Sequence, residues 1–269
     1  MKLINALSIL PEMRGAVAIA FMPTLRDIFN NPTLLLHPVQ IQQVFMKHLW
    51  ALYGDGMDEG NKVTKQRLIS INAKGVVLDI GAGYGHTASY LDPTLVTKYI
   101  ALEPNTFMHP EIRTRAASAG FTESDGTLQI LSFGAQETDL ICAALRNEGC
   151  TSAGVDTIIS IHSLCSIPSP QKSLYGLLEH VLKNGGKFLY FEHVRNTRED
   201  AAWWQGFWSP CWSLLFGGCR LDRATDVWVD EWDGWGSEEG MKVAWRTDEE
   251  DESTNFFCHR VGQYVKTQK

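Results

Sequence analysis

A strand-like run leads directly into an acid and three closely spaced glycines, within the segment VLDIGAGYGHT at Val77–Thr87. The acid and the glycines are Asp79, Gly81, Gly83 and Gly85. Glycines at a turn between a strand and a helix let the backbone approach a ligand where a Cβ atom would collide. The helix expected behind them would add unpaired N–H groups and the positive end of its dipole. This turn is the first candidate for a ligand site.

A second acid stands about 20 residues further on, where the next apolar run ends at Glu103 in YIALEPN. An acid at this place can accept both hydroxyls of an adenosine ribose. A nicotinamide fingerprint requires G-x-G-x-x-G, but here the third glycine comes one residue early and His86 stands in its place. The acid Asp79 suits a ligand with an ammonium and a sulfonium better than a pyrophosphate. The pattern therefore favours S-adenosylmethionine, with a nicotinamide oxidoreductase as the weaker alternative.

Two histidines lie where parallel strands should end. His162 follows the apolar run Thr157–Ile161, and His193 closes YFEHV after the run Lys187–Phe191. The ligand crevice of an open α/β sheet lies beyond these carboxyl ends. An imidazole there can accept a proton near neutral pH, so His193 and His162 are the candidate catalytic residues. The alternative for His193 is that one member of the pair Glu192–His193 simply pins the next segment; for His162 the favoured role is packing against the cofactor.

The remaining chain supplies the elements that must position these residues. From Gly75 onward, short β-branched apolar runs alternate with stretches of helical spacing, which is typical of βαβ units. The predicted strands are Val76–Ile80, Tyr99–Leu102, Leu128–Leu131, Thr157–Ile161, Lys187–Phe191, Met241–Trp245 and Phe256–Val265. The predicted helices are His86–Leu91, Pro110–Ala119, Thr138–Asn147 and Pro170–Leu182, the last closed by Gly185–Gly186. The sequence predicts a Rossmann-like α/β fold with a doubly wound, mostly parallel seven-stranded sheet and an antiparallel C-terminal edge strand.

Two regions fall outside this alternation. Residues 1–74 look mostly helical, with Val39–Tyr53 the clearest amphipathic run, and are expected to form an extension or lid on an α/β domain at 75–269. Residues 199–235 hold seven of the nine tryptophans and are expected to form a cap insertion. Both are placed to cover the crevice of the sheet.

Part of this cap carries an aromatic stripe. Spacing of four residues puts Trp204, Trp208 and Trp212 on one helical face. Such a stripe is usually core, but its position after the fifth strand also makes it a candidate wall for an apolar substrate. Trp228, Trp232 and Trp235 are expected to continue the same cap.

Composition narrows the classes of partner. The net charge is -7 and no run of Lys or Arg stands out, so nucleic acid is not expected. The six cysteines show no CxxC pair and no histidine at zinc-ligand spacing, so we expect buried thiols and no metal. No span approaches the roughly 20 apolar residues that cross a bilayer. We expect a cytoplasmic protein with a small-molecule partner; peripheral membrane contact is the less favoured alternative, and the oligomeric state is left open.

The run from about Gly75 to Val194 resembles a class I S-adenosylmethionine-dependent methyltransferase. Its later part is similar to the methyltransferase-like seven family, the alkyl thiol S-methyltransferases. This likeness is carried by SLCSIPSPQKSLYGLLEHVLKNGGKFLYFEHV at Ser163–Val194, WWQGFWSPCWSLLFGGCRLDR at Trp203–Arg223 and CHRVGQYVK at Cys258–Lys266. The animal members begin with a hydrophobic membrane anchor, and the opening of this sequence does not resemble one.

The resemblance implies a role for each residue around the crevice. The implied cofactor contacts are Asp79, Gly81, Ala82 and Gly83 at the methionine end, Glu103 at the ribose, Pro104, Asn105, Gln136 and Glu137 at the adenine, and His162 and Ser163 at the sulfonium. The implied reaction is methyl transfer to a small, hydrophobic or aromatic molecule, with sulfur, oxygen and nitrogen acceptors in that order. The alternative is a protein that binds the cofactor but catalyses a cyclisation or isomerisation, because the fold does not fix the reaction.

Overall fold

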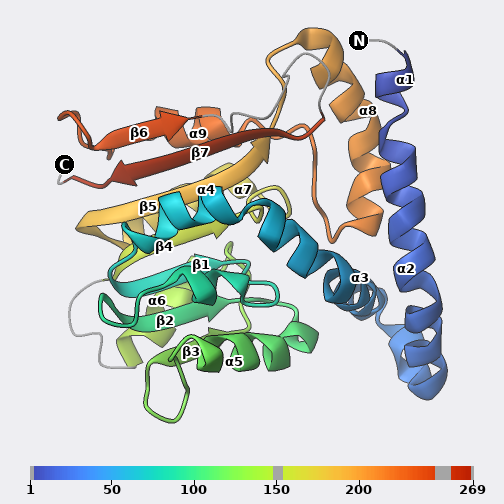
Figure 1. Ribbon diagram of the computed structural model, residues 1–269, viewed down its shortest axis with the longest axis horizontal. Helices are drawn as coiled ribbons and strands as arrows, with labels where there is room; N and C mark the ends of the chain where they lie inside the picture. The colour runs from blue at the N-terminus through green and yellow to red at the C-terminus, as the bar shows by residue number, and fades with distance from the viewer. Residues whose placement is uncertain (1–2, 148–153, 246–255, 268–269) are drawn as a thin grey trace.

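The computed structural model describes residues 3–147, 154–245 and 256–267, built around a seven-stranded sheet of order β3-β2-β1-β4-β5-β7-β6 (Figure 1). Its strands are β1 (Gly75–Ile80), β2 (Val96–Leu102), β3 (Leu128–Leu131), β4 (Val155–Ile161), β5 (Leu182–Val194), β6 (Lys242–Trp245) and β7 (Cys258–Val265). The first five strands pair in parallel, whereas β7 is antiparallel to both β5 and β6. The predicted Rossmann-like fold is confirmed.

The sheet has a separate apolar core on each face, because successive side chains of a strand point to opposite sides. In β1, Val77 packs into one core and Leu78 and Ile80 into the other. The first face is covered by η2 (Gln66–Ser70), η3 (His86–Tyr90) and α5 (His109–Ser118). The second is covered by α6 (Thr138–Asn147), α7 (Pro170–His180) and α9 (Thr225–Glu231). The β2 end is extended by the short turn η4 (Thr106–Met108).

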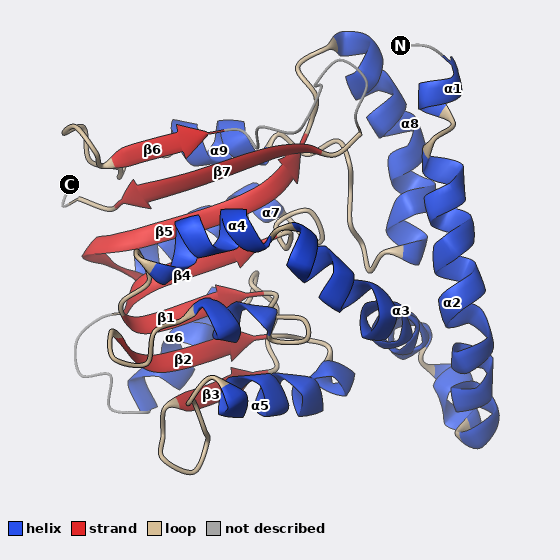
Figure 2. Ribbon diagram, viewed as in Figure 1, coloured by secondary structure: helices blue, strands red, loops and turns tan. Residues whose placement is uncertain are grey.

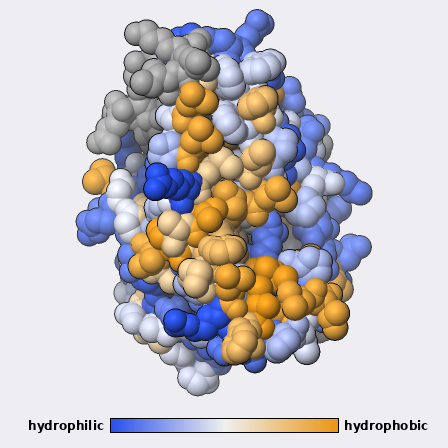
Figure 3. Space-filling view, turned by 90° about the vertical axis from the view of Figure 1, so that its right-hand side faces the viewer, coloured by the Kyte–Doolittle hydropathy of each residue, from blue (hydrophilic) through white to orange (hydrophobic). Residues whose placement is uncertain are grey.

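A third group of helices lies beyond the carboxyl ends of the parallel strands (Figure 2). It consists of α1 (Leu3–Ala6), α2 (Ile9–Asn30), η1 (Pro32–Leu36), α3 (Pro38–Gly60) and α8 (Glu199–Leu215), with α4 (Lys62–Lys65) leading from α3 back toward the sheet. Large apolar side chains stay exposed on α2, among them Phe21, Met22 and Phe29, and Figure 3 shows apolar side chains gathered on this side of the molecule. No described helix is long and apolar enough to cross a membrane.

The segment after the glycine turn differs from the prediction. We expected a helix at His86–Leu91 with a dipole that favours a ligand, but the structure has only the five-residue 3-10 turn η3. Leu91 is already extended, and Pro93 disfavours helical backbone at the residue before it. So short a turn contributes little dipole. The prediction that a helix dipole at this place favours the ligand is wrong.

Two further expectations are corrected. Gly185–Gly186 lie inside β5 rather than at the end of α7, which already stops at His180; Gly185 has φ +79° and its N–H donates to the Lys266 carbonyl. Trp228, Trp232 and Trp235 do not continue the cap that contains α8. They pack with Phe188 and Tyr264 in the core on the α7 and α9 side of the sheet, because α9 returns the chain to that face.

Candidate cofactor and acceptor site

The turn after β1 needs glycine at two positions, each for its backbone conformation and for a close neighbour. Gly81 and Gly85 have φ of +66° and +79°, a region that side chains disfavour. A Cβ on Gly81 would lie 2.7 Å from the Cβ of Ser163, and one on Gly85 would lie 3.0 Å from the backbone of Ile112 in α5. The turn is therefore pressed between α5 and the segment after β4, while Gly81 itself remains exposed.

Asp79, at the end of β1, is buried beneath this turn. Its carboxylate accepts a hydrogen bond of 2.8 Å from the Tyr99 hydroxyl and another from the Thr87 side chain. Burial raises the pKa of Asp79 to about 6, although both hydrogen bonds oppose this shift. The acid is held in a fixed orientation and is ionised only near neutral pH and above.

Glu103 is the matching acid at the end of β2, the strand next to β1. Its two carboxylate oxygens accept from the backbone N–H groups of Gly83 and Asn105, each at 2.8 Å. Burial raises the pKa of Glu103 to about 7 against these two hydrogen bonds, and the negative charge of Asp79 adds to the rise. Two buried carboxyls thus flank the glycine turn, an arrangement that suits a ligand with a positive charge and several hydroxyl groups.

Helix α3 lies over the glycine turn and the β2 end. The Asn105 amide donates to the Gln43 carbonyl at 2.9 Å, and the Tyr84 hydroxyl donates to the Lys47 carbonyl at 2.7 Å. The indole nitrogen of Trp50 lies 3.0 Å from where a Cβ on Gly83 would be. Backbone groups of α3 therefore fasten it on both sides of the turn.

The C-terminal half of α3 adds charged contacts. Asp55 lies 2.9 Å from Nε2 of His86 and 2.6 Å from the Arg115 guanidinium of α5. One turn later, Asp58 accepts from the Tyr90 hydroxyl at 2.9 Å and from the buried Lys65 ammonium at 2.6 Å. The N-terminal region is thus joined to the motif by side chains that the sequence analysis did not single out. Acids at successive turns of one helix face are the signal that could have indicated them.

The residues predicted to contact the adenine lie on the β3 side of the sheet, next to the end of β2. Gln136 and Glu137 follow β3, whose end is bonded to the end of β2 through the Glu103 N–H and the Leu131 carbonyl. Both side chains are exposed, and Glu137 accepts from the Gly134 N–H at 2.7 Å. Pro104 is also exposed, whereas Asn105 is buried beneath α3.

His162 occupies the end of β4 in strained backbone, with φ +52°. Its ring lies 4.5 Å from the Phe191 ring and 5.1 Å from the His259 ring, and its Nε2 is buried without a hydrogen-bond partner. Burial, together with the neighbouring histidines, holds the pKa of His162 well below its usual value. The ring is therefore neutral and a poor proton acceptor.

Glu192 holds the segment after β4 in place. The carboxylate is fully buried, and one of its oxygens accepts from the Ser160 hydroxyl at 2.7 Å and from the N–H groups of Ser163 and Leu164 at 2.9 and 3.1 Å. Ser163 in turn touches the glycine turn at Gly81. In the pair Glu192–His193, the acid is the member that pins a neighbouring segment.

His193 is buried near the end of β5 and does not face open solvent. Its Nε2 lies 3.2 Å from the Cys219 sulfur, which also accepts from the Trp212 indole N–H at 3.3 Å. Cys165 lies in the same group. The sequence analysis missed this sulfur cluster because its members lie in three separate segments. The five cysteines of the described segments are free thiols, and Cys150 lies outside those segments.

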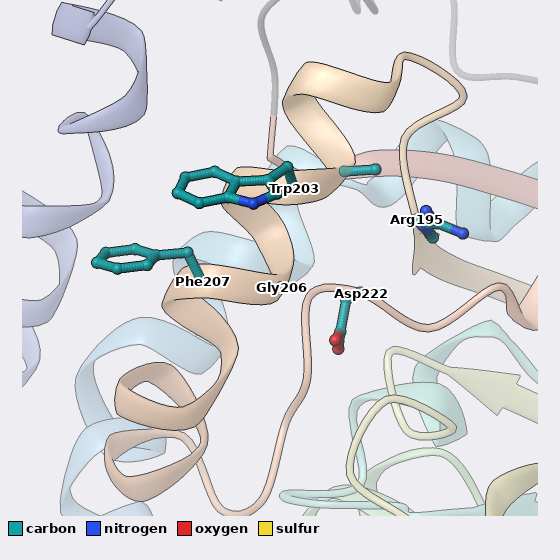
Figure 4. A pocket seen from close by; sticks show the side chains of 6 residues that line it. Arg195, Trp203, Gly206, Phe207 and Asp222 are labelled. Atoms are coloured by element: carbon teal, nitrogen blue, oxygen red, sulfur yellow. The ribbon is translucent and has the colours of Figure 1, made fainter.

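The tryptophan stripe of α8 packs against the N-terminus. Trp204, Trp208 and Trp212 belong to a cluster with Ile9 and Leu221, and the Trp208 indole donates to the Ala6 carbonyl. On a different side of α8, a pocket of about 520 Å³ is lined by Arg195, Ala202, Trp203, Gly206, Phe207 and Asp222 (Figure 4). None of these six lining residues is a predicted site residue, so this pocket is not the predicted crevice.

Comparison with known proteins agrees with this architecture. A family model described as a methyltransferase domain matches residues 57–228, more than half of the chain. The thiol S-methyltransferase TMT1B of Rattus norvegicus is 35% identical over 79 residues, which cover 29% of this chain and 31% of the relative. Human TMT1B, also named a thiol S-methyltransferase, is 25% identical over 164 residues, covering 61% of this chain and 60% of the relative. The matches span less than two thirds of either relative's length.

A solved structure shows the same fold. The O-methyltransferase family protein of Burkholderia thailandensis superposes with a TM-score of 0.53 at 12% identity, over 87% of this chain and 62% of that one. The glycine turn fits S-adenosylmethionine, because Gly81 is exposed and two buried carboxyls stand beside it. The chain belongs to the methyltransferase-domain family, and its cofactor is S-adenosylmethionine.

Proposed function

We propose that this protein transfers the methyl group of S-adenosylmethionine to a small hydrophobic molecule, with a thiol as the first choice of acceptor and oxygen and nitrogen acceptors after it. The names of the two thiol S-methyltransferase relatives support sulfur. The observation that carries the proposal is that neither histidine at the strand ends is hydrogen-bonded to a carboxylate that would strengthen it as a base. Nε2 of the half-buried His162 has no partner, and Nε2 of His193 faces the sulfur of Cys219.

The acceptor chemistry follows from this lack of a histidine–carboxylate pair. A thiol with a pKa near 8.5 already forms some thiolate at neutral pH, whereas an aliphatic alcohol depends on a base to remove its proton. When bound, the cofactor supplies a methyl group that its sulfonium activates for attack in line. The protein then has to align the two reactants and exclude water, and alignment alone can provide a large rate enhancement.

Residues at the carboxyl ends of the strands, together with α3, would perform these functions. Glu103 would hold the ribose hydroxyls, and Asp79 would fix the glycine turn and complement the positive charge of the methionine end. Helix α3, with Trp50 over Gly83, would shield the cofactor from water. Glu192 would keep Ser163 and the strained His162 beside the sulfonium.

Release of S-adenosylhomocysteine from the purified full chain tests the proposal. We would supply S-adenosylmethionine with matched alkyl thiols, phenols and amines of equal carbon number. The expected result is fastest release with the thiol, rising with its chain length. A preference for phenols or amines would contradict the choice of sulfur, and conversion of a substrate without release of S-adenosylhomocysteine would favour the cyclisation or isomerisation alternative.

A further inference from the structure

Three side chains from distant segments bring sulfur and nitrogen atoms together beside the acceptor side of the sheet. Cys165 follows β4, His193 lies near the end of β5, and Cys219 lies in the loop between α8 and α9. One ligand atom of each side chain lies within 4.8 Å of those of the other two. Within the described ranges, this is the only group of three or more His, Cys, Asp and Glu side chains arranged in this way.

The histidine of this group lacks the partners that a buried imidazole usually has. His193 is 5% exposed, its Nδ1 has no hydrogen-bond partner, and its Nε2 faces a sulfur rather than an oxygen. Buried polar groups are nearly always satisfied, and an imidazole normally bonds to a carboxylate, a carbonyl or water. The 2% exposed Cys165 also places a thiol at this buried point. A bound ion would give these soft ligands the partner that they lack.

We propose that Cys165, His193 and Cys219 bind one thiophilic divalent cation of the zinc class. Two thiolates and one neutral imidazole are ligands that zinc prefers, and together they balance the charge of the ion. Zn–S and Zn–N bonds of about 2.3 and 2.0 Å place ligand atoms of a tetrahedral site about 3.5–3.8 Å apart. The observed 3.2 Å between Nε2 and Sγ and the 4.8 Å limit bracket these values, so small side-chain rotations suffice.

Groups around the cluster support the ligands. The Trp212 indole N–H donates to the Cys219 sulfur, an outer hydrogen bond of the kind that orients metal ligands. The Arg223 guanidinium donates to the carbonyls of Leu164 and Ile167 and so fixes the segment that carries Cys165. An ion here would tie the loop after α8 to the ends of β4 and β5. It would lie beside His162, whose ring centre is 6.4 Å from that of His193.

Cobalt titration tests the site without any need for enzymatic activity. The full chain would be reduced, treated with a chelator, desalted without oxygen and titrated with Co²⁺. We expect absorption bands of tetrahedral cobalt and of cobalt–thiolate charge transfer that saturate at one equivalent and disappear when Zn²⁺ displaces the cobalt. Absence of both bands from the folded wild-type chain would overturn the proposal. So would a Cys165–Cys219 disulfide whose reduction restores no metal uptake.

Matched serine variants assign the ligands. Cys219→Ser should weaken Co²⁺ binding by more than about 100-fold, because even outer partners of metal ligands are worth about 10–100-fold. Cys211→Ser makes the same chemical change at an exposed thiol of α8 and should leave binding unchanged. Equal binding by the two variants would exclude Cys219 as a ligand. If Cys219→Ser does not fold, the wild-type titration still decides whether the ion binds.

Discussion

The carboxyl ends of the parallel strands form two regions with different chemistry, a cofactor half around β1 and β2 and an acceptor half around β4 and β5. Around β1 and β2, glycines and buried acids meet a helix that is fastened by hydrogen bonds and ion pairs, as Asp55 and Asp58 of α3 show. Around β4 and β5, histidines, thiols and aromatic rings are packed with few charges, and one oxygen of the acid Glu192 accepts three hydrogen bonds from neighbouring groups. The first half is arranged for a charged cofactor of fixed structure. The second is a desolvated wall suited to an apolar acceptor.

The largest expected effect is the loss of cofactor binding after a change in the cofactor half. Gly81→Val should abolish binding of S-adenosylhomocysteine, because the new side chain needs φ +66° and would collide with Ser163. Isothermal titration calorimetry measures the loss. Gly56→Val, in α3 where a Cβ meets nothing within 4 Å, is the control and should bind normally. Wild-type affinity in the Gly81 variant would show that the turn does not contact the cofactor.

A smaller loss is expected from the ribose acid. Glu103→Ala should weaken binding of S-adenosylhomocysteine by about 1–3 kcal/mol, the value of hydrogen bonds to a charged group. Competition or calorimetry would measure it, with Glu123→Ala as the control because that acid is exposed and pairs with Arg113. If both variants bind like the wild type, Glu103 has no part in cofactor binding.

The pKa of Glu103, about 7, predicts that pH changes cofactor affinity and the free energy of unfolding in opposite directions. As pH falls from about 8 to about 6, protonation of Glu103 should weaken cofactor binding, and Asp79, with its pKa of about 6 and the ammonium of Lys65 nearby, adds to this below about pH 6.5. Without cofactor, the folded state holds this proton more tightly than the unfolded state. The free energy of unfolding should therefore fall as pH rises from about 4.5 to about 7.

Titration of S-adenosylhomocysteine at several pH values, together with denaturant unfolding of the free protein, measures both trends. Glu103→Gln should flatten both of them above about pH 6.5, where Asp79 contributes little, because it removes the titrating group and keeps the shape. Equal pH slopes for this variant and the wild type would assign the effect to other groups.

The smallest expected change in cofactor affinity comes from the acceptor half. His193→Ala should lower turnover while the affinity for S-adenosylhomocysteine stays within about twofold, because the ring lies among Cys219, Phe257 and His162 rather than at the glycine turn. Steady-state kinetics beside calorimetry separates the two quantities. A loss of affinity with normal turnover would make His193 a structural residue of the cofactor half and would remove the contrast between the halves.

The cofactor half could be predicted from the sequence, because it depends on local spacing. The turn Asp79–Gly85 and the strands around it are encoded within short segments, so their pattern is visible along the chain. The sulfur cluster joins Cys165, His193 and Cys219 across 54 residues, and no spacing rule relates them. The helix expected after the turn failed for a local reason, because Pro93 disfavours helical backbone at the residue before it. Leu68 and Ile69 of η2 pack on the same face of the sheet as η3.

That last arrangement has a consequence for the order in which the chain is made. Leu68 and Ile69 belong to the same core as Phe191 of β5 and Val261 of β7, and Val261 is synthesised about 190 residues after Leu68. Contacts of such long sequence separation slow folding, because the loop must close before they form. The nascent chain must therefore carry the apolar side chains of η2 without their β7 partners until β7 has left the ribosome. We expect residues 1–74, although translated before the sheet, to be docked among the last.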